Sequence, residues 1–211
     1  RIWCCNLNLI SVLETNPMGF LDFLKPRDKT TSVHEAYLSI VNQARRPELY
    51  ASGGAPDNFD GRVDMMAMHV HLVLRRLRAQ GMGRSDIGQD LFDLFFKDMD
   101  QAMREAGVCD MCVGKKVQKM VEAFYGRATA YDEVLDALPD TNREHMASGI
   151  YDVLSRNLYP DAALSAQHEA VLNALATYVL SLDTHLAGVT LGDILSGRSF
   201  EAAPILKVAY G

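Results

Sequence analysis

Apolar residues recur every three to four positions over most of the chain, the spacing that places them on one face of an α-helix. The clearest run lies between Phe59 and Gln80, where one face carries Val63, Met66, Val70, Val73, Leu74 and Leu77. No convincing alternation of apolar and polar residues is present, so β-strands are not expected. The pattern predicts an all-α fold, a single-domain helical bundle of about six to eight helices.

Capping residues and helix breakers mark the expected ends of these helices. Ser32-Val33-His34-Glu35 has the spacing of a capping box, and Pro47 cannot continue a helix, so a helix is predicted between them. Thr141-Asn142-Arg143-Glu144 repeats the capping-box spacing before another helix. Further helices are expected over residues 86–106, 111–125, 129–138, 142–158, 161–187 and 191–195, with 161–187 as the longest.

The chain of 211 residues is expected to form one domain, because domains hold roughly 150 residues. Residues 1–31 are predicted to be an N-terminal extension, 32–196 the helical domain and 197–211 a C-terminal tail. The first seventeen residues carry one positive charge and have the features of neither a secretory signal nor a mitochondrial presequence. We expect Met18 to be the native start.

Composition and charge exclude several classes of protein. Apolar types make up 48% and charged types 23%, as in ordinary globular proteins. The net charge of −6 disfavours wholesale binding to a phosphate backbone, so no specific nucleic-acid partner is expected. The longest uncharged run, Ala170 to Leu182, is shorter than the roughly 18 apolar residues of a membrane-spanning helix. Four cysteines are too few for a disulfide framework and favour a reducing compartment.

Cys109-Asp110-Met111-Cys112 is the motif with the clearest chemical potential, because two thiols at this spacing can oxidise reversibly or bind a metal. A thioredoxin-like site needs a preceding strand, and tetrahedral zinc needs two more ligands, which only Cys4 and Cys5 offer. We therefore expect Cys109 and Cys112 to be ordinary small buried residues. A thiol-disulfide redox protein remains the alternative from a different functional class.

No other constellation of enzyme chemistry is found. Residues 107–115 lack the spacing of a Walker phosphate loop, and His69 and His71 point about 200° apart on a helix. No catalytic, cofactor-binding or metal site is predicted, and the protein is not expected to be an enzyme. Asp98 lies within the apolar arc of its helix, so it is expected to be a buried structural carboxylate paired with Arg62 or Arg127.

Two surfaces are candidates for binding a partner. Met65, Met68 and Leu72 form a second apolar strip opposite the first one on their helix, which indicates either a central helix or a side offered to a partner. A basic face carries Lys115, Lys116 and Lys119 opposite an apolar one. The basic face is either simply solvated or a docking site for acidic protein loops, anionic lipid or ribosomal RNA.

An ordered set of short motifs between residues 49 and 138 resembles the ubiquinol-cytochrome c chaperone family. The set comprises Phe59-Asp60-Gly61-Arg62-Val63-Asp64-Met65, residues 72–78, Leu91-Phe92-Asp93, Asp98-Met99-Asp100, Val113-Gly114-Lys115-Lys116-Val117 and Glu122-Ala123-Phe124-Tyr125-Gly126-Arg127. The resemblance implies an all-helical, non-enzymatic protein. Because the family usually carries small residues other than cysteine at 109 and 112, these thiols are interpreted as incidental to the shared function.

The resemblance also implies a function and its partners. Family members bind newly made cytochrome b and assist assembly of the ubiquinol-cytochrome c reductase, which implies partners among the reductase subunits and contact with a ribosome or membrane surface. Bacterial relatives lack a targeting sequence, which implies a place in the bacterial cytoplasm, peripheral to the inner membrane. A general helical interaction scaffold is the remaining alternative. We expect the partner-binding surface to comprise Asp60, Arg62, Asp64, Met65, Met68, Lys115, Lys116, Lys119, Tyr125 and Arg127.

Overall fold

The fold consists of helices, as the sequence pattern predicts. A computed structural model describes residues 29–51, 54–82, 86–137, 142–160 and 164–206, and this part of the chain holds seven α-helices and no strand. Most of the predicted N-terminal extension and the end of the tail lie outside these residues. The elements are α1 (Lys29–Ala44), the 3-10 helix η2 (Pro47–Leu49), α2 (Phe59–Ala79), α3 (Asp86–Glu105), α4 (Asp110–Leu135), α5 (Arg143–Leu158), α6 (Ala166–Ala187) and α7 (Leu191–Leu195).

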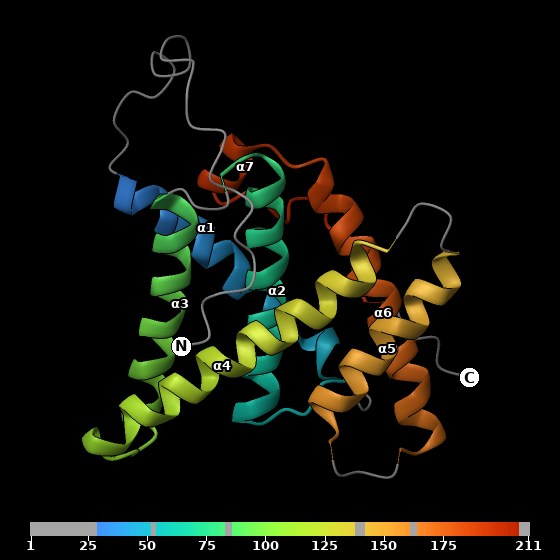
Figure 1. The fold of residues 1–211 in the computed structure, drawn as a ribbon, viewed down its shortest axis with the longest axis horizontal. Helices are drawn as coiled ribbons and strands as arrows, with labels where there is room; N and C mark the ends of the chain where they lie inside the picture. Colours follow the sequence, from blue (N-terminus) through green and yellow to red (C-terminus); the bar gives the residue numbers. More distant parts are fainter. Residues whose placement is uncertain (1–28, 52–53, 83–85, 138–141, 161–163, 207–211) are drawn as a thin grey trace.

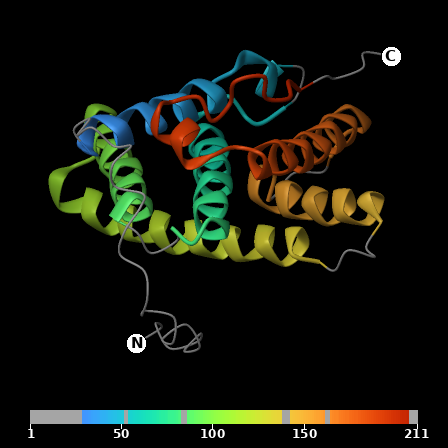
Figure 2. The ribbon, with the colours of Figure 1, turned by 90° about the horizontal axis from the view of Figure 1, so that it is seen from above.

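Helix α2 is the centre of the bundle and contacts α1, α3, α4, α5 and α6. In Figure 1, α4 crosses the front of the molecule diagonally, with α3 on one side and α5 and α6 on the other. The view from above shows α2 between α1 and α4 (Figure 2). Neighbours on several sides explain the second apolar strip of α2, because Met65, Met68 and Leu72 are all buried in the core.

Several predicted helix boundaries were wrong, each for a local reason. Ser32 and Glu35 do not cap a helix, because α1 already begins at Lys29. The helices predicted over 111–125 and 129–138 are one helix, α4, which runs straight through Gly126 and is the longest of the described elements. A single glycine lowers helix propensity by only about 1 kcal/mol, and the packing of α4 outweighs this cost.

Two further boundaries differ by a few residues from the prediction. Helix α6 begins at Ala166 and not at residue 161, because the Ser165 side chain accepts a hydrogen bond from the His168 backbone N–H and caps it. Asn142 caps α5 through its side-chain oxygen, which accepts from the Glu144 backbone N–H at 3.2 Å. Thr141, the predicted capping residue, lies outside the described residues. None of the helices among the described residues combines the length and the hydropathy of a membrane span.

A chain of hydrogen bonds joins α1, α6 and α2 inside the core. The Gln43 amide donates to the Tyr178 hydroxyl at 2.8 Å, and this hydroxyl lies 2.8 Å from His69 Nε2. His69 Nδ1 lies 2.7 Å from the Met65 carbonyl, so Nδ1 carries the proton and Nε2 accepts from Tyr178. Complete burial lowers the pKa of His69 to about 4, so the ring is neutral near pH 7.

Replacing Tyr178 with phenylalanine is expected to lower the free energy of unfolding by about 1–2 kcal/mol, because His69 Nε2 and the Gln43 amide would both lose a buried partner. Urea unfolding near pH 7 measures the effect. Tyr151→Phe is the matched control, since the Tyr151 side chain is only partly buried, and a change within about 0.5 kcal/mol is expected there. Equal effects of the two substitutions would contradict the network.

Candidate functional site

An open groove on the surface is lined by the first half of α2 together with α3 and α4. It consists of two cavities of about 250 and 350 Å³ that share Phe59, Asp60, Lys119 and Met120 in their walls. Phe59 is 42% exposed, which is uncommon for a phenylalanine side chain. We call this site the α2–α4 groove and define it by Phe59, Asp60, Val63, Asp64, Met103, Val108, Lys116, Lys119, Met120 and Arg127.

Both signs of charge line the groove. Asp60 and Asp64 project from α2, whereas Lys116, Lys119 and Arg127 project from α4. Arg127 Nη2 contacts Asp64 Oδ1 at 2.8 Å, and Arg127 Nε is buried with no hydrogen-bond partner among the described residues. The apolar floor and the charged walls together suit an amphipathic protein segment, which would bury its apolar side and pair its charges at the rim.

The ion pair in the groove does not keep Asp64 fully ionised near neutral pH. Burial raises the pKa of Asp64 to about 6, Arg127 opposes this effect, and the nearby Asp60 carboxylate adds to it. The stability contribution of a raised carboxyl pKa is complete below the unfolded pKa of about 4 and is lost as the pH rises through 6. The groove therefore becomes more negative between pH 5 and pH 7.

Asp64→Asn is expected to remove this pH dependence. The free energy of unfolding of the variant, minus that of the natural protein, should rise by up to about 2 kcal/mol between pH 4 and pH 7, because only the natural protein must ionise a buried carboxyl. Urea unfolding at several pH values gives both profiles. Asp152→Asn is the control, since Asp152 is exposed and is not among the groups that shift the pKa of Asp64. Parallel profiles for Asp64→Asn and the natural protein would contradict the assignment.

The structure brings together five of the ten residues predicted for the partner surface. Asp60, Asp64, Lys116, Lys119 and Arg127 line the α2–α4 groove. This convergence could not be derived from the sequence, because it depends on how α2 and α4 cross. The Lys115 side chain is exposed on α4 but lines neither cavity.

Tyr125 and Arg62 lie outside the groove. Tyr125 is exposed and packs against Phe92, with ring centroids 5.7 Å apart, beside a different cavity of about 510 Å³. Arg62 Nη2 pairs with Asp57 at 2.6 Å, and its guanidinium stacks over Tyr50. Both residues are accessible, but the groove does not include them.

Met65 and Met68 cannot form part of a partner surface in this structure. Their exposed fractions are 1% and 2%, because the neighbouring helices cover both sides of α2. Placing them on the surface was wrong. Phe59 and Met120 provide the exposed and partly buried apolar area of the groove instead.

The predicted pairing of Asp98 was wrong as well. The Tyr37 hydroxyl donates to Asp98 Oδ2 at 2.7 Å and joins α1 to α3. Arg62 and Arg127, the predicted partners, instead pair with Asp57 and Asp64. The apolar arc of α3 indicated that Asp98 needs a partner, but only the packing of α1 on α3 identifies it.

Cys109 and Cys112 are not buried, so the expectation that they are ordinary small core residues was wrong. Both are exposed, and a disulfide joins them at the start of α4. The first side chains of α4 are exposed to solvent, and Val113 is the first residue of this helix that is buried. In the described residues no group of three or more histidine, cysteine or acidic side chains could hold a metal ion.

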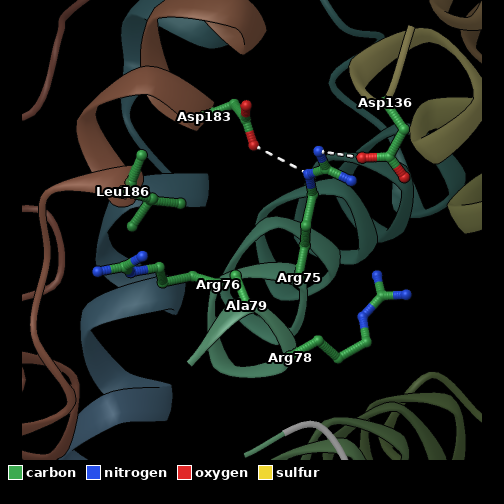
Figure 3. Close-up of a pocket in the computed structure, with 8 residues that line it drawn as sticks. Arg75, Arg76, Arg78, Ala79, Asp136, Asp183 and Leu186 are labelled. Carbon is green, nitrogen blue, oxygen red and sulfur yellow. Dashed lines mark hydrogen bonds and ion pairs between the residues drawn. The ribbon is translucent and has the colours of Figure 1, made fainter. Parts of the chain in front are cut away.

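A second charged cavity, of about 330 Å³, has a structural explanation (Figure 3). Arg75 is held between Asp136 of the α4 end and Asp183 of α6. Arg76 Nε donates to the Val189 carbonyl at 2.8 Å, and Arg78 pairs with another carboxylate of α4. Each of the three guanidinium groups therefore already has a partner within the protein, a carboxylate for Arg75 and Arg78 and a backbone carbonyl for Arg76, and we interpret the cavity as structural.

Comparisons with known proteins identify relatives of the chain. The sequence profile of a family described as "Ubiquinol-cytochrome C chaperone" matches residues 52–202. The crystal structure of the Cbp3 homolog from Brucella abortus is 30% identical in sequence, with a TM-score of 0.68, and the match covers 85% of this chain and 94% of that chain. No protein of curated function matches the chain.

Proposed function

Since this chain belongs to the ubiquinol-cytochrome C chaperone family, we propose that it is an assembly chaperone of the ubiquinol-cytochrome c reductase and that its client is newly made cytochrome b. The observation that carries the proposal is the family match over residues 52–202, a range that includes every residue of the α2–α4 groove. The similarity to the Cbp3 homolog in sequence and fold agrees with membership of this family.

We propose that the α2–α4 groove is the surface that holds the client. Phe59 and Met120 offer apolar area, and a methionine side chain adapts to differently shaped segments. Lys116 and Lys119 on one wall and Asp60 on the other would fix the orientation of the bound segment. A newly made membrane subunit exposes apolar surface that is prone to aggregate, and a protein that covers this surface reversibly lowers that risk by mass action, without a catalytic residue.

The place of action that fits this client is the surface of the inner membrane, where cytochrome b is inserted. We propose that the chain works in the bacterial cytoplasm, peripheral to that membrane. The exposed Lys115, Lys116 and Lys119 supply positive charge for contact with anionic lipid, each worth about 1 kcal/mol near a membrane surface. Contact with the ribosome that makes the client is a second role for the same face.

Reversing two charges of the groove tests the client surface. The double variant Lys116→Glu/Lys119→Glu is expected to bind cytochrome b about tenfold more weakly, because two attractive contacts become repulsive. The helical fold should be kept, since both side chains are exposed. Capture of newly made cytochrome b by the tagged full chain measures the effect.

The matched control is Lys97→Glu, a charge reversal at an exposed position of α3 that lines neither cavity of the groove. Capture should be unchanged in this variant. Deleting the gene should deplete the assembled reductase, and restoring the natural chain should recover it. Normal reductase levels after deletion would contradict the proposed chaperone function. Equal capture of cytochrome b by the double variant and by Lys97→Glu would contradict only the proposal that the α2–α4 groove holds the client.

A further inference from the structure

The disulfide between Cys109 and Cys112 is open to reagents and to other proteins. Both cysteines are exposed, and Met111 between them has an exposed fraction of 91%. Their Cα atoms lie 5.3 Å apart, a separation that a disulfide spans without movement of the backbone. A structural disulfide is usually enclosed by the core, whereas disulfides that undergo exchange are accessible to an incoming thiolate.

The start of helix α4 would stabilise the Cys109 thiolate that forms when the disulfide is reduced. Cys109 is the N-cap residue of α4, a 26-residue helix, and its side chain caps no backbone N–H in the oxidised form. After reduction, the Cys109 thiolate would lie at the positive end of the helix dipole, where anions are stabilised. Asp110, the acidic residue next to it, is paired with Arg104, which reduces its repulsion of the thiolate.

The two cysteines also lie at one end of the α2–α4 groove. Val108, which lines the groove, directly precedes Cys109, and Lys116, which also lines it, follows Cys112 by about one helical turn. We propose that Cys109 and Cys112 are a reversible dithiol–disulfide couple that exchanges with thiols and disulfides of the glutathione type. This inference goes beyond the chaperone function and does not depend on it.

The exchange balances in atoms and electrons. The Cys109 thiolate attacks one sulfur of an oxidised disulfide RSSR, so that a mixed disulfide forms and RS⁻ leaves. The Cys112 thiolate then attacks the Cys109 sulfur, closes the protein disulfide and releases a second RS⁻. The two protons of the protein thiols end on two RSH molecules. The protein loses two electrons, RSSR gains them, and reduction follows the same steps in reverse.

Peptide-resolved trapping of thiols tests the couple in the natural full chain. The protein is equilibrated in mixtures of reduced and oxidised glutathione, free thiols are alkylated, and the tryptic peptide Glu105–Lys115 is weighed by mass spectrometry. This peptide contains Cys109 and Cys112 but neither Cys4 nor Cys5. As the ratio of reduced to oxidised glutathione rises, the peptide should change from an unlabelled disulfide to a doubly alkylated form. The midpoint of this change should be the same whether the protein starts oxidised or reduced.

Three results would overturn the couple. The peptide could stay doubly alkylated in excess oxidised glutathione, or stay a disulfide in excess reduced glutathione without denaturant. It could also accumulate as a stable glutathione adduct. Since the measurement uses no client, its failure leaves the chaperone function untouched, and loss of client capture leaves the couple untouched.

Single-cysteine variants test the role of Cys109. With Cys112→Ser, Cys109 should be alkylated at pH 7 roughly tenfold faster than Cys112 is with Cys109→Ser, because the thiolate is the reactive form and the N-cap position of Cys109 on α4 stabilises an anion. Both positions are exposed, so neither variant should unfold the domain. Faster alkylation of Cys112 would overturn the assignment of Cys109 as the attacking thiol.

Discussion

Replacing Gly61 with alanine is expected to lower the free energy of unfolding by about 3 kcal/mol. Gly61 lies in the first turn of α2, where its backbone N–H donates to the Asn58 side chain at 2.9 Å. A Cβ atom at this position would lie 2.1 Å from the Pro56 carbonyl oxygen, so backbone must move. Because Phe59 and Asp60 begin the same turn, the movement would also displace a wall of the α2–α4 groove.

Gly126→Ala is the matched control for this substitution. Gly126 lies within α4, and apart from its chain neighbours and the backbone of its own helix a Cβ atom there would meet no atom within 4 Å. Alanine should therefore stabilise the protein by about 0.5–1 kcal/mol through its higher helix propensity. Chemical unfolding of both variants measures the difference, and a stable Gly61→Ala protein would show that the turn before α2 tolerates a side chain.

Arg75→Met is expected to cost about 2–3 kcal/mol of stability, because one guanidinium joins three helices. Its nitrogens lie 3.1 Å from Asp132 and 2.6 Å from Asp136 at the end of α4, and 3.2 Å from Asp183 on α6. Methionine keeps much of the apolar stem but leaves three carboxylates close together. The expected cost is below that of a fully buried pair, because Asp136 is mostly exposed.

The control is Arg78→Met, three residues further along α2. Arg78 is half exposed and has one of these carboxylates, Asp132, as its partner at 3.0 Å. Its loss should cost less than about 1 kcal/mol. Thermal unfolding of the two variants at the same pH separates them, and an equal loss would mean that Arg75 does not join the helices more strongly than an ordinary surface ion pair.

The periodicity of apolar residues was enough to predict the helices but not the neighbours of each helix. The stripe of α2 predicted one buried face, and the apolar residues on its opposite face left two interpretations open. Met65 and Met68 belong to the core because α2 has helices on several sides. Asp98 shows the same limit, since its need for a partner followed from its own helix and the identity of Tyr37 did not.

The sequence was enough to predict several residues of the candidate site, but it did not show that they lie together in one groove. Asp60, Asp64 and Arg127 lay within the motifs that resemble the family, and the structure places them in one groove. Phe59 was not among the residues predicted for the partner surface. Its place as the first residue of a helix was the signal that could have identified it, because this position leaves the aromatic side chain partly exposed. The exposure of Cys109 also could not be derived, since it depends on where α4 enters the core.

Site-specific crosslinking tests the central claim, that the α2–α4 groove holds newly made cytochrome b. A photoreactive phenylalanine derivative replaces Phe59 in the groove or, as the control, Leu38, an exposed residue of α1, which lies on the other side of α2 from α4 (Figure 2). Illumination of cells that synthesise cytochrome b should give an adduct with that subunit from position 59 and none from position 38. Equal adducts at both positions, or an adduct only at position 38, would contradict the groove as the client site.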